Sequence, residues 1–534
     1  GSGNFRNRPE FGDSADLQTR TVDGSDFVSG NSGFRIKLRE KLVGFDFEHM
    51  PLNAKVWFPQ GDGPFPLVLM VHGNHNLAEF SDPGYAYLGR HLARKGYIAV
   101  SVDENFLNGS FVGGLSNEND ARGWMLLQHL RQWHEWNRSD TSVFHRLVDT
   151  TRIALVGHSR GGEAAAIAGN FNRLPYYPDD ATIPFDFNFN IRSIIAIAPS
   201  ESQYNPAGKA NQLENVNYFI IQGAHDADVS SFMGMRQYHN TTLTKEGIFK
   251  ASLYSYRSNH GQFNTVWGNT DFGWPLSLFL NKKPLLEEVE QRRLGLVYMT
   301  GFLEATLKDK HEYIPMFRDH RWLKHWLPED IYISRYEDAG FTPVCTFEED
   351  VDVTTATLEG ASINAAKLAV WKEHRLGFRG GGDKDNNAVT LGWRSDTIPA
   401  DSLAVDTLIE PAKPASYTIH LPEELVGKHA LDSSTLLAFS AANTKEEVPE
   451  EDDDEDRDGK TDDKDSPNDN EGEEQKASEH VQDNPLDETD SDTAQTSEPV
   501  QVDFSIRLVD SDRDTASLPL SHFAWIPPVL ESEF

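Results

Sequence analysis

Cysteine is nearly absent from this chain, and long apolar runs are absent altogether. The single cysteine, Cys345, excludes an intramolecular disulfide and leaves the redox compartment open. No apolar stretch is long enough to span a bilayer, so we expect no membrane span. Basic residues are scarce, with 49 Lys and Arg against 84 Asp and Glu and a formal net charge of −35. That balance disfavours nucleic acid and anionic membranes as partners, because both require a basic face.

No signal peptide is visible at the start of the chain. The opening Gly1-Ser2-Gly3 is typical of the remnant of a removed expression tag, and an export signal is easily lost in the same step. We therefore expect a secreted or periplasmic protein, with a cytoplasmic one as the alternative. The sequence leaves the oligomeric state open.

Composition and periodicity divide the chain into four parts. Residues 1–34 are polar, and we expect them to form a loosely packed arm. Between residues 35 and 310, strand-like apolar runs alternate with helical patterns, which predicts an α/β domain with a mostly parallel central sheet. Residues 311–339 are interpreted as a connector. Residues 340–534 show short strand-like runs separated by turn residues, which predicts an all-β domain of sandwich or jelly-roll type.

Several elements can be placed within these parts. A helix is expected over residues 120–136 with Asn119 as its cap, and another over residues 284–308. Strands of the C-terminal part are expected over residues 416–421, 435–439 and 502–508.

The negative charge is concentrated in one segment. Residues 446–499 carry 24 acidic and 4 basic side chains, so 20 of the 35 net negative charges lie there. This composition predicts a disordered acidic insert within the β domain. Around Gly459 the carboxylates recur in a pattern that resembles the calcium loops of thrombospondin type 3 repeats and, without the final Glu, of EF-hands. A solvated linker is the alternative to a structural Ca²⁺ site with the ligands Asp454, Asp456, Asp458, Asp462 and Asp465.

The most informative motif is G-x-S-x-G at residues 157–161. An apolar run at residues 152–156 precedes it, and an Ala-rich helical run at residues 163–168 follows it. A tight strand-to-helix turn of this kind lifts a serine hydroxyl above the edge of a parallel sheet. We therefore expect Ser159 to be a nucleophile, with an ordinary glycine-rich turn as the alternative.

A serine hydroxyl needs a neighbouring base, and that base needs an acid to orient it. The strand expected at residues 218–223 is followed by Asp226, which is the expected acid, and by Asp228, which is the alternative. The next strand, at residues 251–256, is followed by His260. The chain order Ser, Asp, His is the one that a nucleophile elbow requires, so His260 is the expected general base.

Acyl transfer also needs two backbone donors for the developing oxyanion. The N–H of Arg160, directly after the nucleophile, is expected to be one. The turn at residues 72–75, after the strand at residues 67–71, is expected to supply the other from Asn74 or His75. Zinc ligation by His72 and His75 is an alternative role for this turn, although no second motif supplies a third ligand.

Aromatic residues near these motifs are candidates for an apolar substrate wall. Phe106, Phe263 and Trp267 are expected to contact substrate, whereas Trp124 is expected to lie in the core because it belongs to the predicted helix over residues 120–136.

The elbow, the His72-Gly73-Asn74-His75 turn and the stretch around His260 resemble the chlorophyllase and cutinase-like branch of the α/β-hydrolases, which is similar to bacterial PET-type polyester hydrolases. The resemblance covers about residues 35–310. It implies an α/β-hydrolase fold and hydrolysis of carboxylic esters, possible polymers among them, by Ser159, Asp226 and His260 without a catalytic cofactor. Small-molecule carboxylesterase or lipase activity is the alternative within this class. A polymer-binding protein on a hydrolase scaffold is the alternative from another class.

Overall fold

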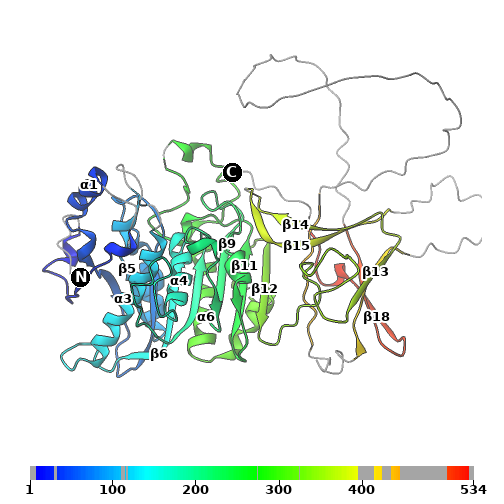
Figure 1. Ribbon diagram of the computed structural model, residues 1–534, viewed down its shortest axis with the longest axis horizontal. Coiled ribbons are helices and arrows are strands. Elements are labelled where there is room, and N and C mark those ends of the chain that lie inside the picture. Colours follow the sequence, from blue (N-terminus) through cyan, green and yellow to red (C-terminus); the bar gives the residue numbers. More distant parts are fainter. Residues whose placement is uncertain are drawn as a thin grey trace, which may run out of the picture. The chain divides into compact units, whose positions relative to one another are not determined.

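The computed structural model describes residues 8–28, 33–109, 115, 118–273, 275–323, 325–379, 381–394, 414–423, 435–444 and 502–527 (Figure 1). These residues belong to two compact units. The first contains the described residues up to 361 together with 373–389. The second contains those of 362–372 and of 390–527.

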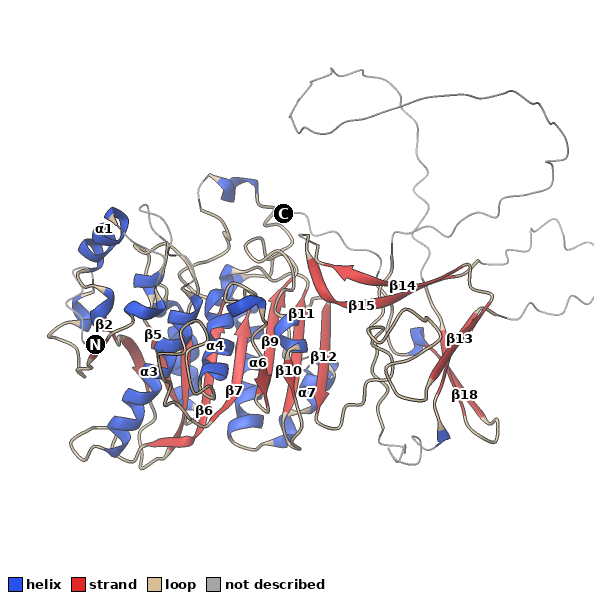
Figure 2. Cartoon of the chain, in the orientation of Figure 1, coloured by secondary structure: helices blue, strands red, loops and turns tan. Residues whose placement is uncertain are grey.

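A mostly parallel sheet forms the centre of the first unit, with eight strands among the described residues (Figure 2). The strand order is β12-β11-β9-β7-β6-β4-β5-β3. The six inner strands are parallel, and both edge strands, β3 and β12, are antiparallel to their neighbours. The strands span Ala54–Trp57 (β3), Phe65–Val71 (β4), Ile98–Val102 (β5), Val148–His158 (β6), Ile191–Ile197 (β7), Asn217–Gly223 (β9), Phe249–Ser255 (β11) and Tyr332–Asp338 (β12).

Helices cover both faces of this sheet (Figure 2). Successive strand residues point to opposite faces, so Leu69 and Leu155 lie in one apolar cluster and Val68 and Val156 in the other. Burial on both faces explains why the inner strands are largely apolar. The first cluster includes residues of α1 (Phe34–Val43), α3 (Asn119–Arg138), α4 (Arg160–Phe171) and α5 (Met235–His239). The second includes residues of α2 (Ala86–Arg94), α6 (Glu288–Leu307) and α7 (Pro315–Arg318).

The order of the strands reverses between β4 and β6. From β4 the chain passes through α2 to β5, toward the β3 edge, whereas from β6 it passes through α4 to β7, toward the β12 edge. Because α2 and α4 lie on opposite faces, the carboxyl ends of β4 and β6 border a topological switch point, where open α/β sheets hold their ligands.

Two parts of the chain differ from the sequence-based expectation. The N-terminal segment is packed against the domain, since Arg8, Phe11, Phe27 and Val28 are all buried. The segment expected as a connector supplies α7 and the edge strand β12 to the domain. Two short pairings also belong to the first unit: β1 (Thr21–Val22) is antiparallel to β2 (Met50–Pro51), and β8 (Leu213–Glu214) is parallel to β10 (Thr241–Thr242).

The described C-terminal residues form small two-stranded sheets. β13 (Ser362–Ala366) is antiparallel to β16 (Ser416–His420), β17 (Ser505–Val509) is antiparallel to β18 (Thr515–Pro519), and β14 (Val370–Gly377) pairs with β15 (Asp383–Gly392). The strands expected over 416–421 and 502–508 correspond to β16 and, in part, to β17. The strand expected over 435–439 is wrong, because those residues are exposed and have no regular structure.

Among the described helices, none combines the length and the apolar character needed to cross a membrane.

Candidate active site

Ser159 lies in the turn between β6 and α4 with a strained backbone. Its φ of 58° and ψ of −128° are rare for a residue with a side chain, and its N–H is held by the carbonyl of Ile197 at 2.8 Å. A Cβ atom at Gly157 would collide with the carbonyl oxygen of Gly161, so only glycine allows this close return of the chain. The chain therefore makes a tight strand-to-helix turn at Ser159, which we call the elbow because a nucleophile elbow requires such a turn.

The turn after β4 passes directly over this elbow. A Cβ atom at Gly73 would lie 2.5 Å from Ser159 Cβ and 2.9 Å from the backbone nitrogen of Arg160. Since β4 and β6 are adjacent parallel strands, the two turns leave the sheet at the same edge. The turn that carries the expected donors Asn74 and His75 therefore lies beside Ser159 and Arg160; their role as oxyanion donors stays a prediction.

The side chains of Asn74, in the turn after β4, and of Arg160, in the turn after β6, contact other groups. Asn74 Oδ1 accepts a hydrogen bond from Gly109 N at 2.7 Å, and the guanidinium of Arg160 is paired with Glu118. The backbone N–H groups of Arg160 and of Asn74 or His75 stay the expected oxyanion donors.

Asp226 and His260 form a buried pair at the same edge of the sheet. His260 Nδ1 donates to Asp226 Oδ2 at 2.8 Å, and the carboxyl is buried completely. Val229 N donates to the other oxygen at 2.7 Å, and Gln222 Nε2 donates to Oδ2 at 3.0 Å. Three donors thus hold the Asp226 carboxylate in one orientation, which fixes the ring of His260 as the acid of a triad would.

Asp228, the alternative acid, lies on the other side of the ring. Its Oδ2 is 3.3 Å from His260 Nε2, and its side chain is 46% exposed. His260 Nε2 is buried and makes no hydrogen bond among the described residues. Burial lowers the pKa of His260, but the Asp226, Asp228 and Asp271 carboxylates outweigh it and raise that pKa to about 10.

His158, the variable residue before Ser159 in the motif, connects the strand-to-helix turn to the loop of His260. Its Nε2 donates to the carbonyl of His260 at 3.0 Å, and its Nδ1 accepts from the hydroxyl of Tyr85, also at 3.0 Å. Burial holds the pKa of His158 well below its usual value, so the ring stays neutral. Sequence reasoning missed this contact, because nothing in the motif distinguishes it from any other residue at that place.

The aromatic candidates divide into one site residue and two core residues. Trp267 stacks on His260 with ring centroids 5.8 Å apart and on His75 with centroids 5.4 Å apart. The expectation that Phe106 and Phe263 face substrate is wrong, because both are fully packed into the apolar clusters at 1% and 0% exposure. Trp124 is buried and stacked on Phe27, as expected for a core residue.

The two histidines of the turn after β4 do not form a metal site in this geometry. His72 donates from Nδ1 to the carbonyl of Gly73 at 2.8 Å and accepts at Nε2 from Glu104 N at 3.1 Å, so neither ring nitrogen has a lone pair to offer. Burial lowers the pKa of His72 to about 3. The described ranges contain no group of three His, Cys, Asp or Glu side chains arranged to hold a metal. The candidate calcium ligands between Asp454 and Asp465 lie outside the described residues.

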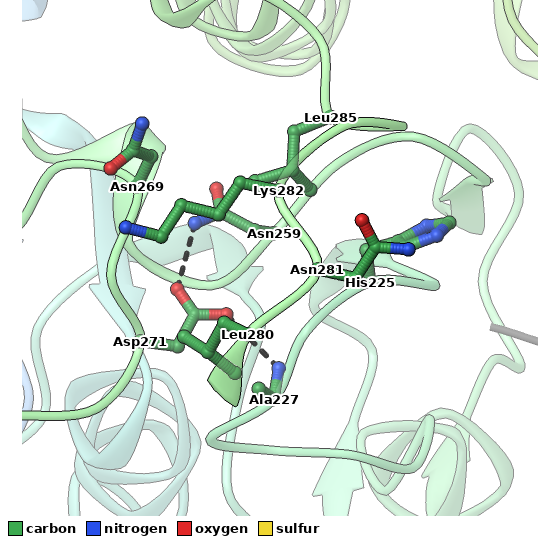
Figure 3. A pocket seen from close by; sticks show the side chains of 9 residues that line it. All are labelled: His225, Ala227, Asn259, Asn269, Asp271, Leu280, Asn281, Lys282 and Leu285. Carbon is green, nitrogen blue, oxygen red and sulfur yellow. Dashed lines mark hydrogen bonds between the residues drawn. The ribbon is translucent and has the colours of Figure 1, made fainter. Parts of the chain in front are cut away.

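Asp271 is a further polar residue that sequence reasoning missed. It follows the 3₁₀ helix η7 (Gly261–Phe263) and contacts the loops of Asp226 and His260 (Figure 3). Its partners are mostly backbone N–H groups, which leave no trace in a sequence.

Comparison with known proteins adds no relative to this picture, since neither the protein-family models nor the curated proteins give a match.

Proposed function

We propose that this protein is a serine hydrolase that cleaves carboxylic ester bonds through Ser159, His260 and Asp226. The supporting observation is the meeting of three features at one sheet edge: a serine in a positive-φ elbow, the turn of residues 72–75 against it, and a buried Asp–His pair. The turns after β4 and β6 and the loops after β9 and β11 supply them. This strand-end arrangement is the one that α/β-hydrolases use.

The proposed reaction begins when His260 Nε2 takes the proton of Ser159 Oγ as that oxygen attacks the ester carbonyl carbon. The N–H of Arg160 and one N–H from residues 74–75 bind the oxyanion of the tetrahedral intermediate. The intermediate expels the alcohol, which receives the proton from His260. Water, deprotonated in turn by His260, then cleaves the acyl-enzyme and restores Ser159. These steps need no metal or cofactor.

The substrate class is proposed from the resemblance to cutinase-like hydrolases. Polyesters and other cutinase substrates are the first choice, and small carboxylic esters or lipids are the alternative. Trp267, beside the imidazole, is the aromatic side chain proposed to contact the acyl or aryl part of the ester.

The test is covalent labelling with a fluorophosphonate followed by peptide mapping. We expect the label on Ser159, and we expect Ser159→Ala to lower p-nitrophenyl ester turnover by about 10⁵-fold or more. Ser193→Ala is the matched control, because Ser193 is equally buried but lies within β7, bonded to Thr306 at 2.7 Å. Labelling at another residue, or full turnover by Ser159→Ala, would refute the assignment. A panel of acyl-chain lengths and polyester films then separates the substrate classes.

A further inference from the structure

Asp271 makes four hydrogen bonds that join two loops far apart in the sequence. Its Oδ2 accepts from the backbone N–H groups of Ala227 at 3.0 Å and His260 at 3.2 Å. Its Oδ1 accepts from Asn259 Nδ2 at 2.7 Å and from Gly261 N at 3.0 Å. Figure 3 shows the carboxylate between Asn259 and Ala227, on the wall of a small pocket.

The two loops joined in this way carry the acid and the base. Ala227 lies between Asp226 and Asp228, and the donors on the other loop are His260 itself and its two neighbours. The Asp226–His260 hydrogen bond depends on the distance between these loops, and an error of about 1 Å at a reacting group can cost on the order of 100-fold in rate. A single carboxylate with two acceptor oxygens is suited to hold that distance, because each oxygen serves two donors.

We propose that Asp271 is a positioning residue that fixes the loop of Asp226 against the loop of His260. The proposal rests on the function proposed above. Asp271 acts through the backbone of these loops and does not contact the reacting atoms.

The first variant to test is Asp271→Asn. An amide has one acceptor oxygen in place of two, so one pair of N–H donors is left facing an NH₂ group. We expect kcat per labelled active site to fall by about 10- to 100-fold, with KM changed by less than about twofold. Active sites are counted by fluorophosphonate titration, so that loss of folded protein is not mistaken for loss of rate.

The pH profile separates positioning from a purely structural role. The groups that face His260 are Asp226 and Asp228 on the acid loop, His158 in the elbow, His75 on the turn after β4, and Asp271. Removal of the Asp271 charge should move the acidic limb of kcat/KM to lower pH. A loss of folding alone lowers the number of active sites and leaves that limb in place.

Two further variants complete the test. Asp271→Glu keeps the negative charge but lengthens the side chain by one methylene group, so we expect a reduced kcat and an acidic limb at the wild-type pH. If Asp271→Asn does not fold, Asp271→Glu tests the proposal in its place. Asp330→Asn is the matched control. Asp330 accepts hydrogen bonds from Ser255 Oγ and Arg257 N, which lie in the segment before His260, and among the described residues it makes no hydrogen bond to residues 259–261. We expect the control to match the wild type in kcat and pH profile.

The failure of this proposal can be told from the failure of the proposed function. If the wild type is labelled at Ser159 and both Asp271 variants turn over at the wild-type rate per site, Asp271 is not a positioning residue. If the wild type is not labelled at Ser159, the proposed function itself fails.

Discussion

At the scale of single residues, the imidazole of His260 lies between two carboxylates in different surroundings. Asp226 is buried and held by three donors, so its geometry is fixed. Asp228 is half exposed and approaches Nε2, the nitrogen that receives the serine proton in the proposed reaction. Both carboxylates stabilise the imidazolium, but a general base must be neutral before it can act. The rate should therefore increase with pH through neutrality, as the raised pKa of His260 is approached.

Replacement of Asp228 by Asn should move the acidic limb of kcat/KM to lower pH. Without the second carboxylate the pKa of His260 falls, so more of the ring is neutral at a given pH and the rate near pH 7 increases by several-fold. Because Asp228 is half exposed, we expect a shift of no more than about one pH unit, smaller at high salt. The measurement is kcat/KM from about pH 5 to about pH 10 at two salt concentrations. Glu79→Gln, which removes the exposed carboxylate facing His75, is the control; an unmoved limb in Asp228→Asn would contradict the prediction.

At the scale of elements, the site is made by the close approach of two strand-end turns. The turn after β4 fits over the elbow only because Gly73 has no side chain: an added methyl group would meet Ser159 Cβ at 2.5 Å and the carbonyl oxygen of His158 at 2.8 Å. Neither atom is the far end of a flexible side chain, so the turn itself would have to move.

Gly73→Ala should therefore separate the oxyanion donors from the serine. We expect kcat for p-nitrophenyl esters to fall by about 100-fold or more and the free energy of unfolding to fall by about 1–3 kcal/mol from overpacking. The measurements are ester hydrolysis and urea unfolding. Gly109→Ala is the control, because its methyl group would meet Asn74 Oδ1 at an ordinary 3.5 Å. Equal effects of the two substitutions would show that contact with the elbow is not the cause.

The elements that could be predicted from sequence are those with strong local patterns. The inner strands were visible as largely apolar runs because both of their faces are buried. The helix expected over 120–136 is α3 (Asn119–Arg138), but Asn119 does not cap it; its amide donates to Glu163 Oε2 at 2.7 Å. β12 was missed because an edge strand with the sequence Tyr332–Asp338 is mostly polar.

The candidate site was predictable in its order along the chain and not in its packing. Ser159, Asp226 and His260 were selected by their places after the strands β6, β9 and β11, and those places share one sheet edge. Phe106 and Phe263 could not be assigned correctly, because sequence gives apolar character without showing which face a side chain takes. Asp271 binds backbone N–H groups, which every residue except proline carries, so no pattern could indicate it.

At the scale of the whole molecule, the N-terminal segment is part of the support of the site. Arg8 is 1% exposed and donates two hydrogen bonds of 2.8 Å to Asp82, with Asp103 at 3.3 Å. Next to Asp82, the hydroxyl of Ser81 accepts from Trp267 Nε1 at 2.9 Å. Arg8 thus places one positive charge against two buried carboxylates, and one of them, Asp82, is next to the serine that binds Trp267.

Arg8→Met should be strongly destabilising, because it leaves the carboxylates of Asp82 and Asp103 buried without their cation. Loss of one partner from a buried pair costs about 3–5 kcal/mol. Burial and Asp103 already raise the pKa of Asp82 to about 6, and removal of Arg8 raises it further. Since a raised carboxyl pKa means that the folded state binds more protons than the unfolded state, the variant should regain stability as pH falls and be least stable above neutrality.

Urea unfolding of Arg8→Met near pH 5.5 and near pH 8 measures both the loss of stability and the direction in which that loss changes with pH. Arg20→Met is the matched control, because Arg20 pairs with Glu135 at 3.1 Å on the surface, with both side chains about two-fifths exposed. An exposed pair of this kind contributes no more than about 1 kcal/mol. If both substitutions cost the same, or if Arg8→Met is more stable at the higher pH, Arg8 does not neutralise the buried carboxylates. The segment would then be held by its other contacts, which include the pairing of β1 with β2 and the apolar packing of Phe11, Phe27 and Val28.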